Sequence, residues 1–190
     1  MIDERYEKHA PDAEVNARLA EIATDLTPGE ALDLGCGPGG DTLWLARRGW
    51  RVTAVDVSGV AVARLTERAR SLGLRVTVER HDLAETFPAG RFDLVSAHYL
   101  HTSFDRTPVL RTAAQALSPG GRLLVVDHGS IAPWSWRQDA HFPTPLEIAA
   151  RLDLEGWRVE RADAPRRVAT GPGGRTAEVV DHVLLIRRTH

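Results

Sequence analysis

Apolar residues in this chain gather in short runs that alternate with stretches where they recur at helical spacing. Short aliphatic and β-branched runs predict strands, at 31–34, 51–56, 74–79, 92–97 and 122–127. Helical spacing and glycine or proline stop signals predict helices, at 12–25, 41–48, 61–72 and 106–117. Strands that alternate with helices are typical of a parallel sheet, so the pattern predicts an α/β fold with a doubly wound sheet.

The C-terminal part has a different pattern. Residues 157–161 and 178–187 are strand-like, the turn-rich sequence T-G-P-G-G lies between them, and no helical pattern separates them. Strands without a crossover helix pair antiparallel. We therefore expect a seven-stranded, mostly parallel, Rossmann-like sheet that ends in an antiparallel hairpin.

Length and composition indicate one domain. The 190 residues suit a single domain, with an N-terminal helix or lid (1–29), a core (30–127) and a substrate loop followed by the antiparallel strands (128–190). No apolar run approaches the roughly 20 residues that span a bilayer, and the first ten residues lack the apolar core of a signal peptide. These features predict a cytoplasmic protein without a membrane partner.

Charge and cysteine content exclude several kinds of site. A net charge of −2 disfavours a broad nucleic-acid surface. The single cysteine, Cys36, excludes an intrachain disulfide and a cysteine-clustered zinc site; inside a glycine loop it suits a small apolar filler. Asp127 alone is too little for a magnesium site, so we expect no metal.

The residues L-D-L-G-C-G-P-G-G-D-T at 32–42 follow the first predicted strand and contain a G-x-G-x-x-G spacing. Such a loop lets the backbone approach a ligand closely, and in open α/β sheets ligands bind at the carboxyl ends of the strands. Asp56 ends the second strand about twenty residues further on, where a carboxylate accepts ribose hydroxyls. This pattern alone also fits a nicotinamide cofactor.

Three features favour an adenosyl sulfonium over a dinucleotide. Asp33 faces the loop, where a carboxylate repels a pyrophosphate but attracts an amino group or a sulfonium. Asp82 and Leu83 offer an acceptor for an exocyclic amine and an apolar contact for an adenine. The antiparallel tail is the third feature.

This set resembles the class I S-adenosylmethionine-dependent methyltransferases. The matching stretches are L-D-L-G-C-G-P-G-G, V-T-A-V-D-V-S, H-D-L, F-D-L-V-S-A-H-Y-L-H and L-S-P-G-G-R-L-L-V-V-D. The run from the glycine loop to Asp56 is similar to the short tellurite-resistance-type branch. The resemblance implies the sheet order 3-2-1-4-5-7-6 and S-adenosylmethionine as the cofactor.

The resemblance also implies roles for individual residues. The methionine moiety meets Asp33 and the backbone of Gly35, Cys36 and Gly37; the ribose meets Asp56, which Val57 follows; and the adenine meets Asp82 and Leu83. Apart from the resemblance, we expect His98 either to contact the cofactor through its backbone or to act as a general base.

Three histidines lie just past predicted strand ends and are candidate general bases, namely His98, His101 and His128. Histidine suits this role because its pKa lies near neutrality. The alternative is that His101 and His128 are ordinary loop residues and that positioning alone drives methyl transfer.

Aromatic residues outside the motifs leave two interpretations open. Trp134 and Trp136 either form a wall of the substrate pocket, or cover the sheet edge or join a dimer contact. Tyr6 and His9 either fold over the cofactor or belong to a frayed terminus. Asp41 we interpret as a helix N-cap.

The sequence thus predicts a methyltransferase that acts on an oxygen, nitrogen, sulfur or chalcogen nucleophile of a small molecule, as a monomer or homodimer. The fourth strand ends in S-A-H-Y and lacks the Asn/Asp-Pro-Pro-aromatic signature that resembles base-methylating enzymes. Two alternatives are an NAD-dependent oxidoreductase and a non-catalytic SAM-binding regulator. A catalytic Tyr-x-x-x-Lys pair of the former is excluded, because Lys8 is the only lysine.

Overall fold

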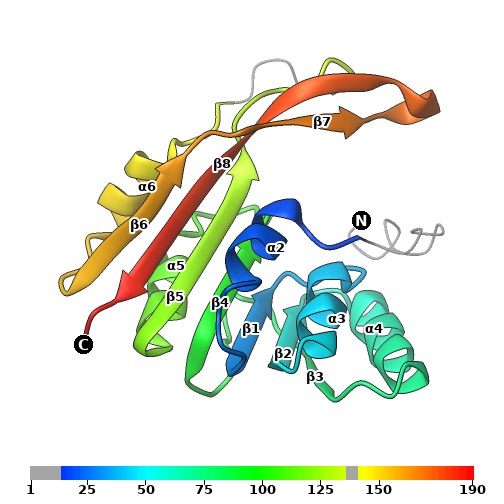
Figure 1. Ribbon diagram of the computed structural model, residues 1–190, viewed down its shortest axis with the longest axis vertical. Coiled ribbons are helices and arrows are strands. Elements are labelled where there is room, and N and C mark those ends of the chain that lie inside the picture. The colour runs from blue at the N-terminus through cyan, green and yellow to red at the C-terminus, as the bar shows by residue number, and fades with distance from the viewer. Residues whose placement is uncertain (1–13, 136–140) are drawn as a thin grey trace.

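The computed structural model describes residues 14–135 and 141–190. Its elements, shown in Figure 1, are α2 (Ala17–Ala23), β1 (Glu30–Leu34), α3 (Gly40–Arg47), β2 (Arg51–Asp56), α4 (Gly59–Ser71), β3 (Val76–Arg80), β4 (Phe92–His98), α5 (Thr107–Gln115), β5 (Leu117–His128), α6 (Pro145–Leu152), β6 (Trp157–Asp163), β7 (Arg166–Thr170), the 3-10 turn η1 (Pro172–Gly174) and β8 (Thr176–Arg188). None of the helices in these two ranges is both long and apolar enough to cross a membrane.

The strands form one sheet in the order β3-β2-β1-β4-β5-β8-β6, and β7 pairs with β8 outside this path. The first five strands of that order are parallel, whereas β8 is antiparallel to β5, β6 and β7. The predicted fold class and order are confirmed, with β8 and β6 in the last two places. The additional strand, β7, was not predicted.

The β7–β8 hairpin corrects the predicted role of T-G-P-G-G. This turn joins β7 to β8 rather than β6 to β8, and its Gly173 and Gly174 have φ of +70° and +75°. Glycine adopts this left-handed conformation without the clash that a Cβ brings. The hairpin extends beyond the other strands, at the top of Figure 1.

Helices cover the sheet on both faces. On one face α5 and α6 bury Leu110 and Ile148 against the strands. On the other face α2 packs through Leu19, and α3 and α4 contribute Leu43 and Leu65. The strands that lie between helical layers are apolar on both sides, which accounts for the continuous apolar runs of the sequence.

Two helices differ from the sequence pattern. The predicted helix 12–25 is shorter as α2, because the side chain of Asn16 caps its first turn and accepts a hydrogen bond from the N–H of Arg18. The helix α6 was not predicted. It begins with a reciprocal capping box between Thr144 and Glu147, which satisfies two otherwise unpaired N–H groups.

We expect Gly39→Ala to destabilise the fold more than Gly73→Ala. Both glycines have positive φ, +84° and +66°, so a side chain adds strain of about 1–2 kcal/mol at either position. A Cβ at Gly39 would lie 2.2 Å from Cδ1 of the buried Leu65, whereas no atom lies within 4 Å at Gly73. Overpacking should add about 1–3 kcal/mol for Gly39→Ala alone, measured by urea unfolding. Equal losses would contradict the close approach of α3 and α4.

Candidate functional site

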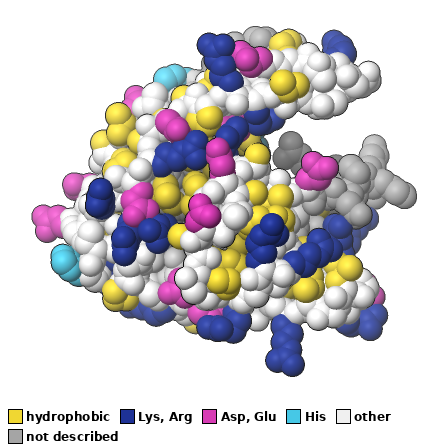
Figure 2. Space-filling view, in the orientation of Figure 1, with side chains coloured by type: hydrophobic (Ala, Val, Ile, Leu, Met, Phe, Trp, Pro, Cys, Tyr) yellow, Lys and Arg dark blue, Asp and Glu magenta, His cyan; other side chains and the backbone are white. Residues whose placement is uncertain are grey.

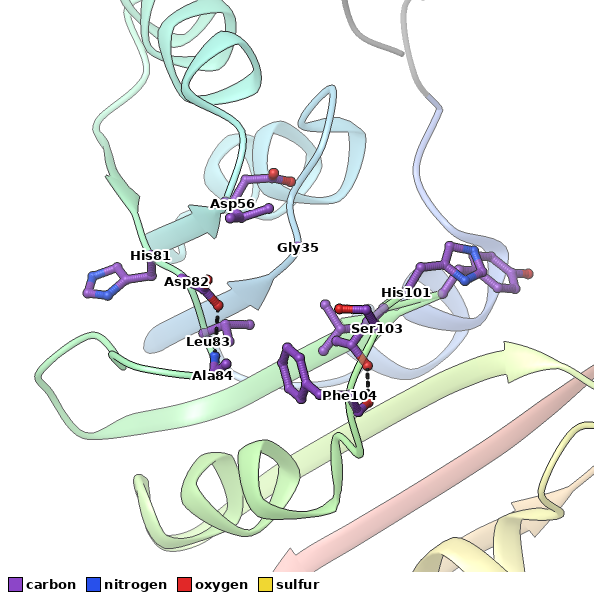
Figure 3. A pocket seen from close by; sticks show the side chains of 13 residues that line it. Gly35, Asp56, His81, Asp82, Leu83, Ala84, His101, Ser103 and Phe104 are labelled. Carbon is purple, nitrogen blue, oxygen red and sulfur yellow. Dashed lines mark hydrogen bonds between the residues drawn. The ribbon is translucent and has the colours of Figure 1, made fainter. Parts of the chain in front are cut away.

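A cavity of about 380 Å³ lies at the carboxyl ends of the parallel strands. Its size is that of typical small-molecule sites. Figure 3 shows it between the glycine loop, the end of β2, the segment after β3 and the segment after β4. Six residues predicted from the sequence line it, namely Gly35, Asp56, Val57, Asp82, Leu83 and His101.

Asp56 is the central polar group of this cavity. Its side chain is 6% exposed, and its two oxygens accept hydrogen bonds from the N–H groups of Gly37 and Ser58, each at 2.9 Å. These bonds fix the carboxylate at the end of β2. A carboxylate has about four lone-pair positions, so acceptor capacity remains on both oxygens for a pair of neighbouring hydroxyl groups.

Asp82 and Leu83 face Asp56 across the cavity, as Figure 3 shows. One oxygen of Asp82 accepts the N–H of Ala84 at 3.0 Å and thereby holds the turn after β3. The carboxylate keeps capacity for an amine, and Leu83 supplies apolar surface beside it. The pair therefore suits a flat ring that carries an amino group.

Asp33, Cys36 and Gly37 do not line the cavity. Asp33 is buried and accepts a hydrogen bond from the hydroxyl of Thr42 at 2.6 Å. Burial raises the pKa of Asp33 to about 6, and the negative charge of Asp41 adds to the shift. Burial also raises the pKa of the Cys36 thiol, in agreement with its role as an apolar filler. These residues form a layer behind the glycine loop, and their contact with a cofactor stays a prediction.

We expect the wild type to gain stability relative to Asp33→Asn as the pH falls from about 7 toward 4. The folded carboxyl group takes up a proton near pH 6, whereas the unfolded one stays ionised down to its ordinary pKa of 3.8. The folded state then binds more protons, so its free energy of unfolding rises as the pH falls. Urea unfolding of both proteins measures the difference, in which titrating groups that do not interact with Asp33 cancel. A difference independent of pH would refute the raised pKa.

His98 does not reach the cavity. Its side chain is 5% exposed, its Nδ1 lies 2.7 Å from an oxygen of Asp41, and its buried Nε2 has no hydrogen-bond partner within residues 14–135 and 141–190. The interpretation of Asp41 as an N-cap is wrong, because Gly39 holds that position and Asp41 is the second residue of α3. From there its carboxylate also accepts the N–H of Asn16 at 2.6 Å. This closed geometry argues against His98 as a general base.

His101 and His128 belong to a stack of rings beside the cavity. The ring of His128 is stacked on Tyr99 at 4.5 Å between centroids and on His101 at 5.7 Å. Tyr99 and His101 both line the cavity, so His128 lies directly behind them. Burial and the positive charges of His101 and Arg167 lower the pKa of His128. A neutral imidazole able to accept a proton is therefore favoured there.

The sequence analysis missed a polar cluster that holds Tyr99. Tyr99 has a φ of +46°, rare for a bulky residue, and its hydroxyl donates to Asp181 at 2.8 Å. Burial and the bond to Asp181 raise the pKa of Tyr99 to about 12. Asp181 is 1% exposed and also accepts from Arg167. A signal was present, since Asp181 interrupts the apolar run V-V-D-H-V-L-L-I.

Trp134 packs against the β7–β8 turn rather than lining the cavity. A Cβ built on Gly171 would lie 2.3 Å from its indole ring. This contact favours the interpretation that Trp134 covers the sheet. Trp136, Tyr6 and His9 lie outside the described residues. Within those residues, no group of three His, Cys, Asp or Glu side chains is arranged to hold a metal ion.

Comparison with known proteins identifies the family. The profile described as "Methyltransferase domain" matches residues 31–121. TehB from Haemophilus influenzae superimposes with a TM-score of 0.74 over 98% of this chain and 65% of that chain, at 18% identity. This chain belongs to the class I S-adenosylmethionine-dependent methyltransferases. A protein solved in work on the conversion of a disulfide bond into a thioacetal group during echinomycin biosynthesis resembles this methyltransferase over 98% of its length and 91% of that chain, with a TM-score of 0.76 and 26% identity.

Curated relatives of this methyltransferase bear names from different acceptor classes. It is 38% identical to the ribosomal RNA small subunit methyltransferase C of Alcanivorax borkumensis, over 71% of this chain and 42% of that protein. It is 36% identical to the 27-O-demethylrifamycin SV methyltransferase of Amycolatopsis mediterranei, over 60% of this chain and 45% of that protein. The chain therefore spans less than half the length of these two relatives.

S-adenosylmethionine is the cofactor that the family implies. A structural neighbour of this methyltransferase, the magnesium protoporphyrin IX methyltransferase of Synechocystis PCC 6803, was solved with bound SAH, at a TM-score of 0.70 and 17% identity over 97% of this chain and 93% of that chain. The cavity fits such a ligand, because Asp56 offers acceptors for two hydroxyls and Asp82 with Leu83 suits an aminated ring. The family assignment also removes the NAD-dependent alternative.

Proposed function

We propose that this methyltransferase transfers a methyl group from S-adenosylmethionine to an oxygen, nitrogen, sulfur or chalcogen atom of a small molecule. The observation that carries the proposal is the placement of Asp56. Two backbone N–H groups hold its carboxylate at the cavity wall and leave acceptor capacity for the ribose hydroxyls. Asp82 and Leu83 bind the adenine, and the backbone at Gly35 approaches the methionine moiety.

S-adenosylmethionine supplies the methyl group on a sulfonium cation that is ready for in-line displacement. The protein then has to hold the acceptor in line and exclude water. Two of the three candidate histidines suit proton removal. His101 lines the cavity, and His128, stacked on it, has a lowered pKa. We propose that a proton released by the acceptor passes to this pair, and that His98 has a structural role.

A small acceptor agrees with two properties of the chain. The net charge is −2, so a nucleic acid would gain little from overall attraction. The segment after β4 begins with Tyr99, Leu100 and His101, whose side chains supply aromatic and apolar surface to a cavity of small-molecule size.

A binding comparison followed by a transfer assay tests the proposal. Calorimetry with SAH and NAD should give binding of SAH alone. Radiolabelled S-adenosylmethionine and a panel of phenols, amines, thiols and chalcogen oxyanions should then give a labelled small product, whereas labelled RNA would refute the acceptor class. Tight SAH binding without any product would favour a non-catalytic SAM-binding regulator.

His101→Ala and His128→Ala test the proton acceptor. Each should lower turnover of a hydroxyl or amine acceptor about 10²-fold or more, the usual contribution of a general base. The affinity for SAH should change little, and His98→Ala serves as the comparison. Full turnover in both variants would leave positioning as the source of catalysis.

A further inference from the structure

Arg167 lies next to the aromatic wall of the cofactor cavity, in contact with Asp181 and near the ring of Tyr99. Tyr99 and His101 form one wall of the cofactor cavity, and His128 is stacked against both from the other side. His128 and Asp181 face each other across the β5–β8 pairing, and Asp181 accepts two hydrogen bonds from Nε of Arg167, at 2.9 and 3.0 Å. The guanidinium carbon lies 5.9 Å from the centre of the Tyr99 ring.

The guanidinium keeps binding capacity in this arrangement. Within the described residues, the hydrogen bonds to Asp181 use only Nε, and Tyr99 is the other polar side chain that interacts with the guanidinium, so donors on the terminal nitrogens are left for a ligand. The Arg167 side chain is 30% exposed, whereas Asp181 is nearly fully buried. The carboxylate therefore anchors the arginine and leaves its outer edge accessible to solvent.

The positive charge of Arg167 acts on His128, which is stacked on the rings of Tyr99 and His101. It contributes to the lowered pKa of His128. Asp181 does not neutralise Arg167 alone, because Nε of Arg18 also lies 3.6 Å from the same carboxylate. Arg161 pairs with Asp163 and with Glu21. Figure 2 shows basic and acidic side chains intermingled over the visible face of the molecule. Arg167 has no second carboxylate among the described residues.

We propose that Arg167 binds an anionic group, most simply a carboxylate, of the methyl acceptor, and that it selects acceptors that carry this group. The inference rests on the proposed function. A planar guanidinium matches a carboxylate through two parallel N–H···O bonds, which sets orientation as well as affinity. Arg167 belongs to β7, the strand that was not predicted and that pairs with β8 outside the main strand order. The β7–β8 hairpin therefore supplies the residue that selects the acceptor.

Matched acid and amide pairs test the subsite. The probes are benzoate, salicylate and anthranilate, each with its primary amide, because flat rings suit the wall of Tyr99, His101 and His128. Ligand-observed NMR titrations use the wild-type protein saturated with SAH. At least one acid should bind about tenfold or more tightly than its amide, as expected for hydrogen bonds to a charged group. Acids that do not bind, or that bind like their amides, would overturn the proposal.

Two variants assign the effect to Arg167. Arg167→Met should bring the acid and its amide to within about twofold, and Arg166→Met, which changes the exposed neighbour paired with Glu178, should keep the preference. If Arg167→Met fails to fold, Arg167→Lys is the second variant. It keeps the positive charge but lacks the paired N–H donors of the guanidinium, so the preference for the acid over its amide should fall severalfold. A preference that survives in Arg167→Met or is unchanged in Arg167→Lys would refute the role.

The affinity for SAH distinguishes a failure of the Arg167 proposal from a failure of the proposed function. SAH should bind wild type and Arg167→Met with equal affinity, because Arg167 does not line the cofactor cavity. Failure of SAH to bind the wild type would refute the proposed function, and the acid and amide titrations on the free protein would then decide on Arg167.

Discussion

Asp56→Ala is expected to weaken SAH binding by about 1.5–3 kcal/mol, or roughly 10- to 150-fold in Kd. The buried carboxylate lines the cavity and keeps acceptor capacity for two ribose hydroxyls. Alanine removes these acceptors and leaves the N–H groups of Gly37 and Ser58 without their partner. Calorimetry with SAH measures the affinity, and urea unfolding separates the accompanying loss of stability.

Two comparisons make the result specific. Glu67→Ala also removes one negative charge, but Glu67 is exposed on α4 and pairs with Arg70, so SAH affinity should stay unchanged. Asp56→Asn keeps one acceptor oxygen and should fall between alanine and the wild type. If Asp56→Ala binds SAH as tightly as the wild type, the cavity is not the cofactor site and the proposed function loses its main support.

Asp181→Ala is expected to lower the free energy of unfolding by about 3–5 kcal/mol. Asp181 is 1% exposed and accepts from the Tyr99 hydroxyl and from Arg167, with Arg18 at 3.6 Å. Its removal leaves a phenol and two guanidinium groups around a site without a counter-charge. Urea unfolding at neutral pH gives the change.

The neighbouring pair Arg166–Glu178 is the matched control, since it joins the same two strands on the solvent side. Its side chains are 72% and 60% exposed, so Glu178→Ala should cost less than about 1 kcal/mol. Asp181→Asn should recover part of the loss because an amide oxygen still accepts from Tyr99. Similar losses for Asp181→Ala and Glu178→Ala would show that the buried cluster contributes no more than a surface ion pair.

The parts of the fold that bury continuous apolar surface were predictable from sequence. Strands such as Arg51–Asp56 lie between two helical layers and must be apolar on both sides. The meeting of Asp56 and Asp82 at one cavity was predictable for a related reason. Parallel strands end at one edge of a sheet, so Asp56 and Asp82 had to meet there once they were placed after β2 and β3.

The proposed acceptor side was not predictable, because it depends on contacts between distant segments. The strand β7 has no buried face, and its Val168 is 71% exposed, so backbone pairing with β8 rather than hydrophobic burial defines it. Position after a strand end also does not fix where a ring points. His98 turns toward Asp41, whereas His101 lines the cavity.

The pairing of three strands with β8 has a consequence for the synthesis of the protein. The strands β5, β6 and β7 all pair with β8, which follows them in the sequence. During translation these three strands leave the ribosome before the segment that pairs with them. Unpaired strand edges favour aggregation, so the nascent chain is most exposed to misassembly just before Thr176–Arg188 emerges.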